Sequence, residues 1–300
     1  MIWIRRIGVV LGVLVVVVAL GAASVYAMSQ SKLTAKYAVP DESPLTAPAD
    51  PAVLARGEHV ARAIGKCVEC HATDLGGGTV IDAPPIGHVE ATNLTTGKGG
   101  VLALYDDAAL ERAIRHGVGH DGRNLLIMPS DEYHNLSDED VAAVIAYIRA
   151  QPPVDREHRA ASVGPVIRVL WAAGKAYPAT AERIAHDAPH RKSTPVGNTE
   201  EAGKYIAANG CSGCHGQTYS GGPIPGAPPE WKPAANITPT GIGAYSLADF
   251  TRLLRDGVRP SGVAVDTLMP VRATRLMTDE EIEAVYKFLR TVPPKAYGGR

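Results

Sequence analysis

Two five-residue words combine cysteine and histidine at a spacing that suits one kind of chemistry. Residues 67–71 read CVECH (the first word) and residues 211–215 read CSGCH (the second word), and together they hold all 4 cysteines of the 300-residue chain. Two thiols at i and i+3 can add to the two vinyl groups of a porphyrin while the histidine at i+4 faces the iron. The sequence therefore predicts two covalent haem c groups. The predicted attachment residues are Cys67, Cys70, Cys211 and Cys214, with His71 and His215 as iron ligands.

The two words begin two copies of a longer repeat. YDDAALERAIRHGV at 105–118 aligns with YSLADFTRLLRDGV at 245–258, and LSDEDVAAVIAYIRAQPP at 136–153 aligns with MTDEEIEAVYKFLRTVPP at 277–294. Shorter matches join DAPPIG to GAPPEW and NLT to NIT. A repeat of this length predicts two similar structural units, each with its own word.

Other uses of paired cysteines fit this pattern less well. A structural zinc needs four ligands, typically from two clusters brought together, but each word lies in its own complete repeat. A redox C-x-x-C of the thioredoxin type belongs beside a βαβ unit, whereas this sequence has helical periodicity. A disulfide in each word, which export would permit, leaves the repeated histidines without a role. Covalent haem is the interpretation that we favour.

Each repeat also has a methionine followed by proline at the same place. Met128 and Met269 precede the last predicted helix of their repeats. A thioether is a soft, neutral iron ligand that electron-transfer cytochromes use to raise the potential. The alternative is that each methionine only packs in a core, as methionine usually does, but the matched register favours ligation. Met277 aligns with Leu136 and is predicted to be a core residue.

Other histidines do not recur between the repeats. His59 aligns with Tyr205, His116 with Asp256 and His134 with Arg275, so we interpret all three as surface or boundary residues. His88 and His120 also lack a histidine counterpart, although either can compete for the first haem if Met128 is displaced.

Matched loop residues are candidates for orienting the haem. A ligating histidine usually donates its second N–H to a carbonyl, and the proline pairs at 84–85 and 228–229 can aim one at His71 and His215. The alternative is simple turn formation. Further candidates, either for the haem propionates or for capping and packing, are Asn93, Asn236, Tyr105 and Tyr245.

The repeated segments are predicted to be amphipathic helices joined by Gly and Pro loops. Ser137 and Thr278 are predicted N-caps, and Asp140 and Glu281 are placed to complete capping boxes. Because no run alternates like a strand, the predicted fold class is all-α. The repeat and its two words predict two tandem cytochrome c-type helical domains, which follow one N-terminal transmembrane helix. The predicted segments are an anchor (1–28), a tether (29–50), domain 1 (51–153), a linker (154–196) and domain 2 (197–297). Within the linker, the apolar stretch 164–178 is predicted to pack between the domains or on a partner.

The N-terminal segment indicates export. The uncharged stretch from Ile7 to Met28 would span about 33 Å as a helix, which matches a hydrocarbon core of about 30 Å. Arg5 and Arg6 place the N-terminus in the cytoplasm by the positive-inside rule. The alternative is a cleaved signal peptide, because V-Y-A at 25–27 offers small residues for cleavage. Both interpretations export the rest of the chain.

Composition excludes one class of partner and suits a cofactor. A net charge of −1 argues against a nucleic-acid binder. The chain has only 2 Phe and 3 Trp residues, so a large planar cofactor can supply the bulk that two small cores lack.

At the residues of the second repeat, the chain resembles the multihaem cytochrome c subunit of bacterial membrane-bound alcohol, aldehyde and gluconate dehydrogenases. The resemblance is clearest in NITPTGIGAYSLADFTRLLRDGV at 236–258 with the Met-Pro loop that follows, and it extends to IRVLWAAGKAYP at 167–178. The chain has two haem words where that family has three, and NLLIMPS and DTLMPV lack the aromatic residues that the family sets around the methionine. The resemblance implies an exported subunit that takes electrons from a dehydrogenase or respiratory complex and passes them to quinone or an oxidase.

The sequence therefore predicts a dihaem cytochrome c of the bacterial inner membrane, with its haem domains in the periplasm, that transfers electrons and is not itself an enzyme. One alternative is a dihaem peroxidase-like enzyme, which would leave one haem without its methionine. Another alternative is the cytochrome subunit of a respiratory oxidase.

Overall fold

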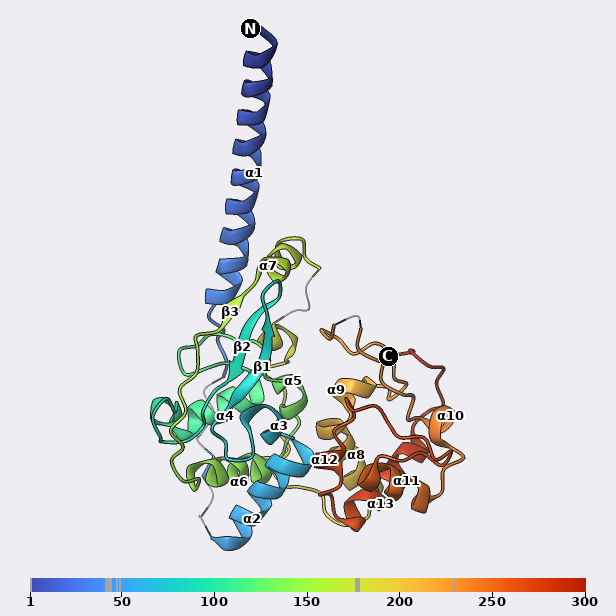
Figure 1. The fold of residues 1–300 in the computed structure, drawn as a ribbon. Helices are drawn as coiled ribbons and strands as arrows, with labels where there is room; N and C mark the ends of the chain where they lie inside the picture. The colour runs from blue at the N-terminus through green and yellow to red at the C-terminus, as the bar shows by residue number, and fades with distance from the viewer. Residues whose placement is uncertain (1, 41–44, 47, 49, 176–178, 229) are drawn as a thin grey trace.

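The computed structural model describes residues 2–40, 45–46, 48, 50–175, 179–228 and 230–300. A long helix, α1 (Ile2–Thr34), leads to two mainly helical bodies that lie side by side (Figure 1). The first body contains α2 (Pro51–His59), η1 (Val60–Ile64), α3 (Val68–His71), η2 (Leu102–Leu104), α4 (Asp107–His116), α5 (Ser130–Tyr133) and α6 (Asp138–Arg149). The second body contains α8 (Glu200–Gly210), α9 (Ser212–His215), α10 (Pro239–Ile242), α11 (Leu247–Asp256), α12 (Val271–Thr274) and α13 (Asp279–Thr291).

The last helix of each body begins at the cap that the sequence predicts. The hydroxyls of Ser137 and Thr278 each accept a hydrogen bond from the backbone N–H three residues later, at 3.1 Å. The capping box is complete in α13, where Glu281 accepts from the Thr278 N–H at 2.9 Å. In α6 the predicted box is not formed, because the Asp140 carboxylate binds Arg56 instead.

Each body is built around one close helix pair. In the first body α2 crosses α6, and a Cβ on Gly57 would lie 2.0 Å from the Ala143 carbonyl oxygen. In the second body α8 crosses α13, and a Cβ on Gly203 would lie 1.9 Å from the Ala284 carbonyl oxygen. Only glycine permits backbones to approach this closely. The same contact at aligned positions confirms that the sequence repeat is also a structural one.

A small antiparallel sheet in the first body corrects the all-α prediction. The strands β1 (Gly78–Ala83), β2 (Gly87–Ala91) and β3 (Ser162–Val163) pair in the order β1-β2-β3. The hairpin joins two runs with β-branched residues, TVI and HVEA, through the turn at Pro84 and Pro85. A short hairpin stabilised by a later segment has no strong periodicity of its own, and the sequence analysis therefore missed it.

The linker binds to the first body rather than crossing freely to the second. Arg156 pairs with Asp74 at 2.8 Å, and the two ring nitrogens of His158 contact Glu90 and the Gly76 carbonyl at 2.9 and 2.8 Å. Further along, the linker forms β3, α7 (Pro165–Ala172) and η3 (Thr180–Arg183). Against the expectation that this stretch packs between the two domains, α7 packs on α1.

Of the residues that the structure describes, only α1 forms a helix long and apolar enough to cross a membrane. The apolar part of this helix is exposed along its length and extends away from both bodies (Figure 1). Length and composition of this kind are shared by retained anchors and by signal sequences.

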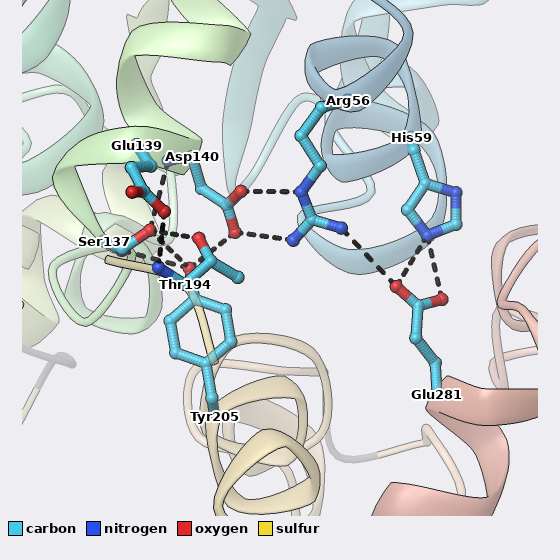
Figure 2. A network of polar contacts seen from close by, with 8 residues as sticks. All are labelled: Arg56, His59, Ser137, Glu139, Asp140, Thr194, Tyr205 and Glu281. Atoms are coloured by element: carbon cyan, nitrogen blue, oxygen red, sulfur yellow. Dashed lines mark hydrogen bonds and ion pairs between the residues drawn. The ribbon is translucent and has the colours of Figure 1, made fainter. Parts of the chain in front are cut away.

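The two bodies meet through a reciprocal polar contact (Figure 2). His59 of α2 lies 2.8 Å from both carboxylate oxygens of Glu281 at the start of α13. The aligned residue of the second body, Tyr205 of α8, donates to Asp140 at the start of α6 at 2.7 Å. Arg56 lies between these pairs and contacts both carboxylates, Asp140 at 2.7 Å and Glu281 at 3.6 Å. The predicted surface or boundary position is therefore confirmed for His59, but it is wrong for His116, which is buried at 2 % exposure in α4.

Candidate haem-binding sites

The first word forms a single helical turn, and a backbone carbonyl fixes the orientation of its histidine ring. Cys67 caps α3, which contains the rest of the word. The Nδ1–H of His71 donates to the Thr92 carbonyl oxygen at 2.8 Å. Burial lowers the pKa of His71, so the ring is neutral at neutral pH and its Nε2 is available as a ligand.

An apolar cavity opens beside this word. The space outside the protein atoms here is about 900 Å³, part of which is open to solvent. The groups in its wall that can bind a porphyrin or its iron are Cys67, His71 and Met128. The rest of the wall is mainly aliphatic and includes Leu75, Leu102, Leu110, Ile114, Leu136 and Ile148. An apolar cavity with one thiol, one imidazole and one thioether fits a haem, because the macrocycle is apolar and its iron binds nitrogen and sulfur.

The loop that carries Met128 is fixed by the linker. The Met128 carbonyl oxygen accepts from the Thr180 hydroxyl at 3.1 Å and from the Ser130 N–H at 2.9 Å. Neither His88 nor His120 lines the cavity. His88 contacts Asp82 and Glu90 at the hairpin, and the His120 ring packs edge to face against the Tyr105 ring.

The second word repeats the histidine geometry of the first. His215 lies on α9 and is buried, and its Nδ1–H donates to the Ala235 carbonyl oxygen at 2.7 Å. Burial lowers the pKa of this histidine as well. Met269 and Cys211 both pack against the hydrophobic core of the body. Met277 is 5 % exposed, in agreement with its predicted core role.

The first cysteine of each word is a partly buried, protonated thiol. All four are free thiols. Burial raises the pKa of Cys67 and of Cys211 to about 11, so both thiols are protonated at neutral pH, unlike the thiolates of redox C-x-x-C motifs. Within the described part of the chain, no group of three or more His, Cys, Asp or Glu side chains is placed to hold a metal ion.

The carbonyls that hold the histidines are not the predicted ones. They belong to Thr92 and Ala235 rather than to the proline pairs, of which residue 229 lies outside the described residues. Each of these carbonyls directly precedes the asparagine of an NLT or NIT triplet. The sequence signal was therefore present in the repeat, but it was assigned to the wrong loop.

The two asparagines fold the loops that present those carbonyls. Asn93 Oδ1 accepts from the N–H and hydroxyl of Thr95 at 3.0 and 2.8 Å, and its amide donates to the Val154 carbonyl at 2.7 Å. Asn236 repeats the turn with Thr238, and its amide donates to the Lys295 carbonyl at 2.8 Å. Of the alternatives for these asparagines, the structure therefore shows capping and packing.

The two words lie against each other across the boundary between the bodies. Lys66, which precedes Cys67, donates to the carbonyl oxygen of Gly210, which precedes Cys211, at 2.8 Å. Beside this contact, Glu132 of α5 lies so close to Gly213 that a Cβ there would be 1.8 Å from the carboxylate. From the corresponding helix of the second body, Arg272 of α12 pairs with Glu69 of the first word. Sequence reasoning missed this juxtaposition because the partners are far apart in the chain.

Comparison with known families assigns both bodies. Residues 200–293 match the family described as cytochrome c, and residues 52–148 match cytochrome c oxidase, cbb3-type, subunit III. Each match contains one word and the methionine that follows it.

Similar proteins cover most of the chain. The cytochrome c subunit of alcohol dehydrogenase (quinone) from Gluconacetobacter polyoxogenes is 27% identical over 83% of this chain and 58% of its own length. The fructose dehydrogenase cytochrome subunit of Gluconobacter japonicus is 29% identical, over 82% of this chain and 54% of its own length. The gluconate 2-dehydrogenase cytochrome c subunit of Pantoea cypripedii is 26% identical, over 82% and 61%. The chain thus spans a little over half the length of these relatives. With its matches to two cytochrome c family models, the chain resembles the cytochrome c subunits of alcohol, fructose and gluconate dehydrogenases.

Proposed function

We propose that this protein is a membrane-anchored dihaem cytochrome c that carries electrons from a partner dehydrogenase to a downstream quinone or terminal oxidase. The observation that carries the proposal is the apolar cavity in which Cys67, His71 and Met128 converge. Both copies of the repeat supply the same residue types in the same order, so we propose two tandem cytochrome domains, each with one haem c.

The proposed haem ligands follow the repeat. In the first domain, Cys67 and Cys70 would bind the haem covalently, with His71 and Met128 as axial ligands. In the second domain, Cys211 and Cys214 would bind it, with His215 and Met269 as axial ligands. Bound in this way, haem c supplies one-electron chemistry at a potential raised by the thioether.

The protein's own residues tune this chemistry through their positions. The carbonyls of Thr92 and Ala235 hold the histidine rings in one orientation and increase the electron density on the ligating nitrogens. The aliphatic wall of the first cavity excludes water, which favours the less charged, reduced state of the iron.

The relatives support the proposed partner. Three of them are named as cytochrome subunits of dehydrogenases, which supports a dehydrogenase as the electron donor. We further propose that α1 is retained as an inner-membrane anchor with a cytoplasmic N-terminus, which places both haem domains in the periplasm.

A second candidate function is favoured by one of the family matches. Because residues 52–148 match a subunit of a cbb3-type oxidase, the same domains could deliver electrons to an oxidase. A peroxidase-like enzyme is less well supported, because both repeats retain their methionine.

Haem content and ligation are tested together. The intact mass of the purified protein should exceed that of the polypeptide by two haems. Met128→Ala and Met269→Ala should each convert one of the two haems to a high-spin spectrum with a lower potential, whereas Met277→Leu, in the core, should leave both unchanged. A haem that stays low-spin at an unchanged potential after loss of its methionine would refute that ligand assignment.

A further inference from the structure

The short helix α7 exposes an apolar face. Val166 and Val169 are 41% and 53% exposed, and Ala173 continues the same side of the helix one turn later. The one charged residue within the helix, Arg168, is directed away from this face toward α1. An exposed apolar stripe on a helix with a polar opposite side is typical of a surface that contacts something.

The contact with α1 fixes the position of this face along the axis of α1. The Arg168 guanidinium lies 4.6 Å from the centre of the Tyr26 ring and donates to the Ser29 hydroxyl at 2.8 Å. Ser29 directly follows the uncharged stretch that ends at Met28, which as a helix is about 33 Å long. A bilayer whose core is about 30 Å thick would therefore end at the level where Arg168 touches α1.

Two backbone hydrogen bonds attach the start of α7 to the first body. The N–H of Val166 donates to the Pro85 carbonyl at 3.0 Å, and the N–H of Gly164 donates to the Ile86 carbonyl at 2.8 Å. Both acceptors belong to the turn of the β1–β2 hairpin, which extends beside the lower part of α1 up to α7 (Figure 1). The hairpin that the sequence did not predict thus connects α7 to the cytochrome domain.

We propose that α7 lies in the outer interface of the bilayer and is a second membrane contact of the first domain. Its apolar face would enter the boundary between headgroups and acyl chains, as interfacial amphipathic helices do. The exposed Lys175, just beyond the helix, can reach lipid phosphates. A lipid surface is favoured over a protein partner because the face is level with the end of the proposed membrane span. The inference rests on the proposed anchor role of α1.

Spin labels placed on the intact haem-loaded protein in lipid nanodiscs test the proposal. Because the four native cysteines would be consumed by haem attachment, Val169→Cys supplies a single free thiol for a nitroxide. Two matched positions calibrate the measurement: Val13→Cys in the middle of α1 and Val263→Cys on the second body, both more than half exposed in the structure. At each position, accessibility to oxygen, which partitions into lipid, is compared with accessibility to a water-soluble nickel chelate.

The expected oxygen-to-nickel ratio at Val169 is several-fold higher than at Val263 and approaches that at Val13. A ratio at Val169 equal to that at Val263, with Val13 still in lipid, would overturn the interfacial assignment and leave the face for a protein partner. Shielding of Val169 from both reagents would overturn it as well, because protein would then cover the face. If Val13 itself were exposed to the nickel chelate, or the N-terminal segment were absent by mass, the anchor proposal would fail first.

Discussion

The hydrogen bonds of Asn93 show how one side chain can orient a proposed iron ligand that it does not touch. Its carbonyl and amide groups close a turn and attach the linker, and the carbonyl of the preceding residue then receives the His71 N–H. The asparagine is fully buried, so its polar groups must find partners within the protein. The residue is therefore expected to matter for both stability and redox chemistry.

Asn93→Ala should lower the free energy of unfolding by about 2–3 kcal/mol, because several buried hydrogen bonds are lost. It should also shift the potential of the first haem and leave the second unchanged. Chemical denaturation and a redox titration measure the two effects. Asn236→Ala is the matched control: this side chain is only half-buried, so we expect a smaller loss of stability and a shift confined to the second haem. Equal shifts of both haems in either variant would contradict the proposed role.

A second residue-scale prediction concerns pH. Burial alone would raise the pKa of Glu281, but the hydrogen bond and charge of His59, the Thr278 N–H and Arg56 outweigh burial and lower it. A carboxyl whose pKa is lower in the folded state stabilises the protein above its unfolded pKa of about 4.3, and the contribution is lost as the pH falls through the folded value.

Glu281→Gln should therefore cost about 1–2 kcal/mol at neutral pH, and the difference from wild type should shrink as the pH falls below about 4. Denaturation curves collected between neutral and acidic pH measure this. Glu280→Gln, one residue earlier and exposed, is the control and should show no such dependence. A difference that stayed constant over the whole range would exclude the charge of Glu281 as its cause.

At the scale of elements, each body depends on a pair of helices whose backbones lie so close that a side chain would not fit between them at the crossing. The α2–α6 and α8–α13 crossings both place a glycine against a backbone carbonyl. These crossings fix where the following turn, which carries the haem word, can lie. The helices that form them were predictable from periodicity and capping residues, but their separation was not.

Gly57→Ala should destabilise the first body by about 2–4 kcal/mol, because a Cβ cannot fit against the Ala143 carbonyl without moving the helices apart. Thermal unfolding measures the loss. Ala55→Gly, at an exposed position of the same helix, should cost only about 1 kcal/mol through helix propensity. If the two variants were equally stable, the close crossing would not be under the constraint described here.

At the scale of the whole molecule, the sequence predicted local structure but not the contacts between residues of the two bodies. The repeat, the caps at Ser137 and Thr278 and the positions of the words follow from signals within a few residues. The hairpin, the linker that wraps the first body and the contact between Lys66 and Gly210 depend on segments far apart in the chain. No local pattern specifies such pairs, so they could not be predicted.

One prediction belongs to this scale. Gly213→Glu gives the second word the residue that the first word has at the same place, Glu69. Here the new carboxylate would meet Glu132, whose pKa is already raised by burial, and like charges repel. We expect the contact between the bodies to weaken by about 2 kcal/mol, with a larger radius of gyration by small-angle scattering and two separate unfolding transitions.

The reciprocal exchange Glu69→Gly removes only an exposed ion pair with Arg272 and should leave the bodies docked. Adding Glu132→Gln to Gly213→Glu should restore part of the compactness. A Gly213→Glu variant that scattered like wild type would show that the words are not held together by this contact.

The reciprocal contact between the bodies has one more consequence. His59 binds the carboxylate at the start of α13, and its aligned residue Tyr205 binds the one at the start of α6, so each body presents the same patch to the other. This is the isologous geometry of a two-fold homodimer, contained in a single chain. Duplication and fusion of a gene for a self-pairing cytochrome would leave this arrangement behind. The linker then preserves at any dilution a partnership that two separate copies would maintain only at sufficient concentration.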